Sequence, residues 1–82
     1  MNTYVYEITI YLTSGHKLQI RTIETELLSE DHIKESMEII MGVSSNYENL
    51  FHVTIKDDVT NKIHVIKTGN VVSVNIGRLP QE

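Results

Sequence analysis

The chain of 82 residues contains no cysteine and no tryptophan, and it has a single proline and a single phenylalanine. The lack of cysteine excludes disulfides and thiolate zinc sites, which many small domains use to supplement a small core. It also agrees with a reducing compartment, so we expect a cytoplasmic protein. A chain this short hides only about 60% of the surface of its unfolded form, which leaves oligomerisation as the main further source of stability.

Long apolar runs and basic segments are also missing. Residues 1–4 begin neither a basic stretch nor a continuous apolar segment, so we expect no signal peptide and no transmembrane helix. The formal net charge is −4, and residues 24–38 alone contain six acids and one lysine, a sum of −5. A DNA-binding protein needs a basic stripe to displace condensed counterions. The sequence therefore predicts no DNA partner and no membrane partner.

Motifs that carry catalysis are missing as well. There is no G-x-S-x-G elbow, no glycine-rich phosphate loop and no activated nucleophile beside a base. The four histidines are His16, His32, His52 and His64. In the strand pairing predicted below, His52 and His64 lie roughly 13 Å apart along the strand direction, too far to share one ion. We therefore predict no enzymatic activity, no cofactor and no metal site.

A hairpin is predicted at the start of the chain. Apolar residues at every second position predict a strand over residues 4–12, and a second strand follows around Leu18 and Ile20. A two-residue turn would mix apolar and polar faces. A three-residue loop at residues 13–15, with Gly15 in the left-handed conformation, instead pairs Ile10 with Leu18. This second register separates the faces, and we expect it.

One helix is predicted after the hairpin, with a clear signal at each end. Ser29 is a suitable N-cap and Gly42 a left-handed stop. An apolar stripe with helical spacing lies between them, formed by Ile33, Met37, Ile40 and Met41. The opposite face is acidic, and Lys34 has the i, i+4 spacing needed to pair with Glu30 and Glu38. The helix therefore covers a core and exposes an acidic surface.

Three further strands are predicted over residues 50–56, 62–67 and 71–76, after a polar loop at residues 43–49. A type I turn opened by Asp58, with Asn61 left-handed, pairs Ile55 with Val65. A two-residue turn at residues 69–70 then pairs Val65 with Val74, which completes a meander. The apolar face of this meander consists of Phe51, Val53, Ile55, Ile63, Val65, Val72, Val74 and Ile76.

These elements predict an α+β domain with the order ββαβββ over residues 1–77, followed by a short tail at residues 78–82. The five strands form an antiparallel sheet, curved or rolled into a half-barrel, with one packed helix. Such a sheet is roughly 24 Å wide, and one helix about 10 Å across cannot cover it. We therefore predict a two-fold homodimer. Its interface consists of the residues expected to face outward: Val5, Tyr11, Ile23, Ile66 and Val71.

The function predicted from these observations is a small non-enzymatic protein–protein interaction module, either a regulator or an inhibitor. Glu30, Glu35 and Glu38 form the surface that a basic protein partner would contact. Small size, absence of cysteine and a one-sided acidic helix are typical of small proteins of phages and mobile elements. The alternative is a small-ligand or RNA-binding domain that uses the outer sheet face, where Tyr11 beside Lys17 is the one aromatic and basic pair expected.

Overall fold

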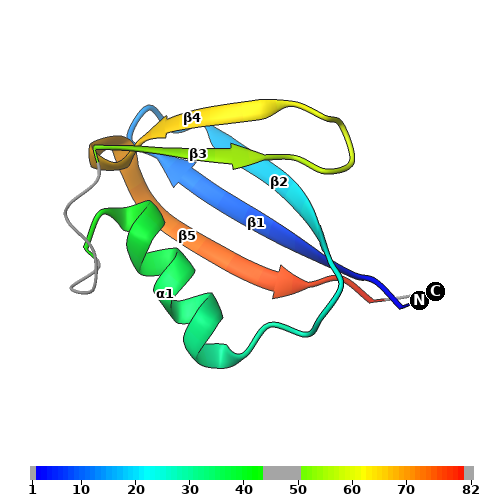
Figure 1. Cartoon of the computed structure of the whole chain (residues 1–82). Helices are drawn as coiled ribbons and strands as arrows, with labels where there is room; N and C mark the ends of the chain where they lie inside the picture. Colours follow the sequence, from blue (N-terminus) through cyan, green and yellow to red (C-terminus); the bar gives the residue numbers. More distant parts are fainter. Residues whose placement is uncertain (1, 44–50, 81–82) are drawn as a thin grey trace.

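The computed structural model describes residues 2–43 and 51–80. The predicted α+β class and the order ββαβββ are confirmed (Figure 1). The elements are β1 (Tyr4–Leu12), β2 (Lys17–Glu24), α1 (Glu30–Met41), β3 (His52–Lys56), β4 (Ile63–Lys67), the 3₁₀ helix η1 (Thr68–Asn70) and β5 (Val71–Arg78). Leu50 of the predicted third strand and most of the predicted polar loop lie outside the described residues.

The first hairpin has the predicted register. Ile10 pairs with Leu18 and Ile8 with Ile20. The N–H of Leu12 donates to the carbonyl of His16 over 2.9 Å, which leaves a three-residue loop. Gly15 in this loop has φ 90°, the left-handed conformation that a residue without a Cβ adopts most easily.

Helix α1 begins and ends where the sequence predicts. The Ser29 hydroxyl accepts the N–H of His32 over 3.1 Å at the start of the helix. At the other end Gly42 has φ 75°, and its N–H and that of Val43 donate to carbonyls of the last turn. This pair of bonds is the Schellman motif, which satisfies carbonyls that would otherwise lack donors.

The strands form two sheets, and the predicted pairing of the last strand with the fourth is wrong. One sheet has the order β2-β1-β5, the other contains only β3 and β4, and neither closes into a barrel within the described residues. Residues 69–70 do not form a two-residue turn because they belong to η1. The carbonyl of Asn70 accepts the N–H of Thr13 over 2.9 Å, so η1 leads the chain to β1.

The β3–β4 hairpin differs from the predicted register by one residue. Asn61 is left-handed as expected, with φ 61°, but Val53 pairs with Ile66 and Ile55 with His64. The reason is that the ladder continues to Asp57, whose N–H donates to the carbonyl of Lys62 over 2.8 Å. The loop therefore has four residues instead of three, and a one-residue slip turns every side chain of β4 to the other face.

The register change decides which side chains of β4 reach the core. Ile66 is 4% exposed, whereas Ile63 and Val65 are 65% and 66% exposed. The core lies between the β2-β1-β5 sheet and a second layer in which α1 runs along β5 and the β3–β4 hairpin lies on the β2 side (Figure 1). Its buried members are Ile8, Ile10, Ile20, Ile40, Ile66 and Val71.

Candidate functional site

The acidic face of α1 is where the sequence places it. Glu30 is exposed, and Glu35 and Glu38 are half-buried. The predicted pairing of Lys34 with its neighbours is wrong: among residues 2–43 and 51–80 the ion pair within 4 Å joins Arg21 and Glu7, at 3.4 Å. The helix carboxylates therefore have no ion-pair partner in the part of the chain that the structure describes.

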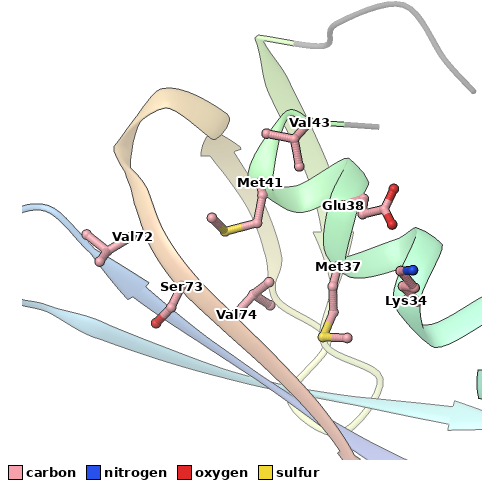
Figure 2. Close-up of a pocket in the computed structure, with 8 residues that line it drawn as sticks. All are labelled: Lys34, Met37, Glu38, Met41, Val43, Val72, Ser73 and Val74. Atoms are coloured by element: carbon pink, nitrogen blue, oxygen red, sulfur yellow. The ribbon is translucent and has the colours of Figure 1, made fainter. Parts of the chain in front are cut away.

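A groove of about 310 Å³ lies between α1 and β5, next to this acidic face. Its walls are mainly apolar, and Figure 2 shows Val74 of β5 lying between Met37 and Met41 of the helix. Two of its lining residues are largely open to solvent, since Val43 is 65% and Val72 57% exposed. Lys34 and Glu38 are the charged residues that line it. The groove thus offers flexible apolar side chains to a ligand, a property of methionine-rich binding surfaces.

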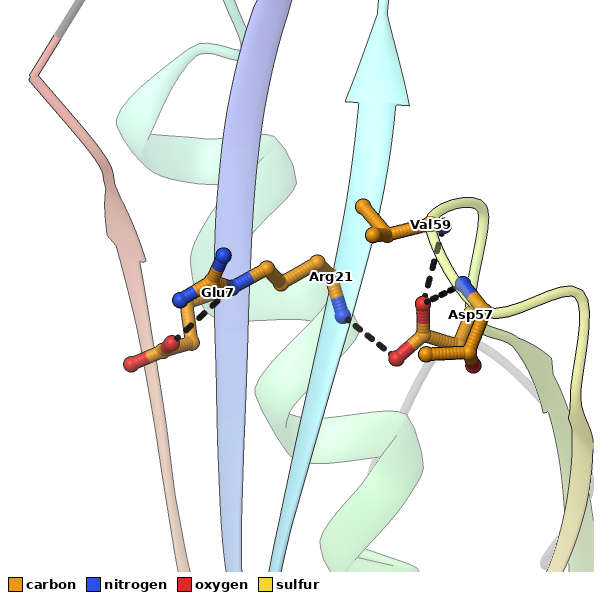
Figure 3. A network of polar contacts seen from close by, with 5 residues as sticks. Glu7, Arg21, Asp57 and Val59 are labelled. Carbon is orange, nitrogen blue, oxygen red and sulfur yellow. Dashed lines mark hydrogen bonds and ion pairs between the residues drawn. The ribbon is translucent and has the colours of Figure 1, made fainter.

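The outer edge of β2 is occupied at Arg21 and Ile23 by the turn of the β3–β4 hairpin (Figure 3). The N–H of Arg21 donates to Asp57 Oδ2 over 3.3 Å, and the N–H of Ile23 donates to Asp58 Oδ2 over 2.8 Å. In return the Arg21 carbonyl accepts the N–H of Asp58 over 2.8 Å. These bonds satisfy backbone groups that would otherwise be a template for another strand.

Asp57 is a buried acid whose carboxylate accepts backbone hydrogen bonds from its own turn and from β2. Its Oδ1 accepts the N–H groups of Val59 and Thr60, each over 2.9 Å, and its Oδ2 accepts from Arg21. The Thr60 N–H is the main cause that lowers the pKa of Asp57 below its ordinary value, and burial opposes it. Because both carboxylate oxygens already accept hydrogen bonds, Asp57 fixes the turn and is poorly placed to act as a base.

The outer edge of β5 is open among residues 2–43 and 51–80. The N–H of Leu79 donates to the Val5 carbonyl, so in this register Gly77 and Asn75 also bond to β1. Backbone groups alternate in direction along an antiparallel strand, which turns those of Val74 and Ile76 away from β1. β5 pairs only with β1, and within the described ranges no hydrogen bond occupies this edge.

Two of the predicted dimer residues are misplaced. Ile66 and Val71 are buried in the core, so the expectation that they face outward is wrong. Ile66 turns inward with the changed register, and Val71 turns inward at a β-bulge that follows Tyr11 in the pairing of β1 with β5. Tyr11 and Ile23 are 39% and 43% exposed, and Val5, which is half-buried, pairs with Ile23.

The sequence does not predict that several large apolar residues are exposed. These are chiefly Phe51, Ile63, Val65 and Val72, which the sequence places on the core face. A signal for two of them does exist: the alternative four-residue loop at residues 58–61 would have turned Ile63 and Val65 outward. No such signal marks Val72, because the bulge beside it depends on a pairing between distant strands.

The histidines do not converge. His52 pairs with Lys67 and His64 with Ile55, which places the two histidines three positions apart along the hairpin and on opposite faces. Within residues 2–43 and 51–80 no three His, Asp or Glu side chains gather closely enough to hold a metal ion. Among those residues there is likewise no helix with the length and apolar character needed to cross a membrane.

The chain matches no protein-family model, no curated protein and no solved structure. The evidence for function therefore lies in the surface chemistry of the protein. The structure brings three features together at one side of the molecule: the acidic helix α1, the apolar groove beside it and the open edge of β5.

Proposed function

We propose that this protein is a non-enzymatic interaction module that binds a basic partner protein through the acidic face of α1. The observation that carries the proposal is the set of helix carboxylates, Glu30, Glu35 and Glu38, which lack ion-pair partners among the described residues. Residues 24–38 sum to −5 and the whole chain to −4, so the remainder sums to +1. The negative field is therefore local to this helix.

A local field of this kind favours protein recognition over catalysis. Complementary charge raises the rate of encounter with an oppositely charged surface and sets orientation, and salt weakens both effects. Asp57, the buried acid among residues 2–43 and 51–80, supports the same interpretation because its carboxylate oxygens accept backbone hydrogen bonds. A regulator or inhibitor that occupies another protein's surface needs nothing more than such a face.

The test compares two triple variants with the same change in net charge. Glu30→Gln, Glu35→Gln and Glu38→Gln remove three negative charges from the helix. The control, Thr13→Lys, Gln19→Lys and Thr54→Lys, adds three positive charges at exposed positions elsewhere. Affinity capture from a nuclease-treated lysate should recover the same basic proteins with the wild type and the control but not with the glutamine variant.

The captured partner then gives a quantitative measurement. Its association rate with the wild type should fall as ionic strength rises, because the Debye length shrinks from about 10 Å at 0.1 M to about 3 Å at 1 M salt. The glutamine variant should show a slower and less salt-dependent rate. Equal capture and equal salt dependence in the two triple variants would disprove a role for the acidic face.

Self-association is a second proposal, supported by the outer face of the β3–β4 hairpin. Ile63 and Val65 lie on this face and are each about two thirds exposed. A two-fold dimer would bury them and would add stability to a small core. Sedimentation equilibrium of the wild type and of an Ile63→Thr, Val65→Thr variant tests this: dimer mass is expected only for the wild type. A wild-type mass of 9.4 kDa up to about 100 μM would refute it.

A further inference from the structure

We propose that the open edge of β5 is a strand-addition site, at which an extended basic segment of the partner pairs with the backbone of Val74 and Ile76. The segment would place alternate side chains into the groove between α1 and β5. The inference rests on the proposed function, since its occupant is part of the same basic partner. It adds the binding mode, the backbone groups involved and the conformation of the ligand.

The backbone geometry defines the occupant as an extended chain. Val74 and Ile76 pair with Ile10 and Ile8 in positions whose own backbone bonds point away from β1. Each therefore offers one N–H and one carbonyl at the open edge. An added strand satisfies such groups in a regular ladder, a mode of peptide recognition that gains affinity from the main chain and specificity from pockets for alternate side chains.

The two outer edges of the β2-β1-β5 sheet differ in how far their backbone groups are hydrogen-bonded, and this difference favours β5 as the binding edge. At the β2 edge, Asp57 and Asp58 bond the N–H groups of Arg21 and Ile23. Proteins also protect edges with proline, lysine or a bulge. The bulge of β5 lies near its start, and around Val74 and Ile76 the strand carries neither proline nor lysine. The protected edge is thus the one away from α1, and the open edge is the one beside the groove.

The groove fits the side chains of a segment better than a whole small molecule. Its volume of about 310 Å³ is at the lower limit of ordinary ligand pockets, which run from roughly 300 to 1,000 Å³. Side chains of an added strand alternate between the two faces, so every second one would lie on the face of Val74, opposite Met37 and Met41. Apolar residues at these positions would cover the exposed Val72.

Charge decides between a basic partner and a second copy of this chain. α1 lies alongside β5, so joining two copies through this edge would bring two segments of net charge −5 together. Like charges on facing surfaces oppose association. A segment in which apolar residues alternate with lysine or arginine has the opposite charge and leaves its polar side chains on the outer face.

The experiment uses a blocked nonapeptide in which lysine and valine alternate, with amide hydrogen exchange of the full chain as the readout. At saturation the amides of Val74 and Ile76 should exchange at least about tenfold more slowly. Those of Asn75 and Gly77 should not change, because they already bond to β1. A peptide with proline in place of every valine has the same charge but cannot form the ladder, and it should not protect these amides.

Two matched variants test the groove. Val72→Lys and Val59→Lys change the net charge equally at valines that are 57% and 55% exposed, but of the two only Val72 lines the groove. Val72→Lys should weaken peptide binding about tenfold or more, and Val59→Lys should leave the affinity within about twofold. Protection that does not alternate along β5, or equal weakening by both variants, would overturn strand addition.

The glutamine triple variant separates this inference from the proposed function. Binding that is lost in that variant but shows no alternating protection overturns strand addition and leaves the acidic-face proposal intact. Alternating protection that the glutamine variant does not weaken supports the strand site and contradicts the acidic-face proposal. Failure of the lysine and valine peptide to bind at all overturns the inference, while the capture experiment still decides the proposed function.

Discussion

Replacing Ile66 and Ile63 by alanine, one at a time, tests the register of the β3–β4 hairpin. The two residues belong to the same strand and differ mainly in burial, with exposures of 4% and 65%. Each change removes three carbon atoms, worth about 0.8 kcal/mol each when fully buried, so transfer from the core costs about 2.4 kcal/mol for Ile66. The cavity left behind raises the loss to about 3–4 kcal/mol.

Only about a third of Ile63 is buried, so Ile63→Ala should lower the free energy of unfolding by about 0.8 kcal/mol. Urea unfolding at pH 7 measures both losses. A domain of this size has a total stability of about 4–12 kcal/mol, and Ile66→Ala could therefore leave too little folded protein to measure. Ile66→Val then serves in its place, with an expected loss of about 0.5–1.5 kcal/mol and a measurable drop in melting temperature.

The register predicted from sequence gives the reverse order, since it places Ile63 inside and Ile66 outside. A larger loss for Ile63→Ala than for Ile66→Ala would therefore show that the observed pairing of Val53 with Ile66 is wrong. Unchanged urea m-values are needed for the comparison, because a changed slope would mean that the surface exposed on unfolding differs between the variants.

Three further predictions concern the turns, the cap and the buried acid. Gly15→Ala should lower the free energy of unfolding in urea by about 1 kcal/mol because φ there is 90°, whereas Gly77→Ala should leave it unchanged. An added Cβ meets no atom within 4 Å at either position, so an equal loss in both variants would contradict the conformational explanation. Ser29→Ala should lose about 1 kcal/mol, with Ser29→Asp close to the wild type, since the side chain caps His32 N–H; equal stability of all three would exclude the cap. Asp57 has a lowered pKa, so its ionised form stabilises the fold above the unfolded value of about 4, and the advantage disappears as pH falls through the lower folded value. The stability difference between wild type and Asp57→Asn should therefore be larger at pH 7 than at pH 2.5 in urea unfolding, and an equal difference at both would refute this role.

The parts of the fold that sequence predicts are those fixed by neighbouring residues. Gly15 sets the first loop, and Ser29 and Gly42 set the ends of α1, because each acts on backbone groups only a few positions away. In the second hairpin Asn61 was identified correctly, but loop lengths of three and four residues both suit it. The choice depends on Asp57, whose carboxylate bonds to β2, thirty-six residues earlier in the chain.

The candidate site could be predicted only in part for the same reason. The acidic helix follows from composition, and the structure places Glu30, Glu35 and Glu38 on one element with no ion pair among the described residues. The groove and the open edge depend on β5 lying beside α1 and pairing with β1. Strand order between distant segments is not encoded in local periodicity, so a meander and the observed strand order fit the pattern equally well.

The position of β5 also has a consequence for how the protein is made. The central strand β1 is synthesised before β5, and the partner of Ile8, Ile76, lies 68 positions later (76 − 8). At about 5–20 residues per second, translation leaves that side of β1 without its partner strand for roughly 3–14 seconds. Closing so long a loop is also slow in a complete chain, because its entropy must be lost before the contacts form. The β1–β2 hairpin therefore exposes the edge of β1 until β5 pairs with it. Dilution, or a chaperone that shields β1, should raise the yield of folded protein.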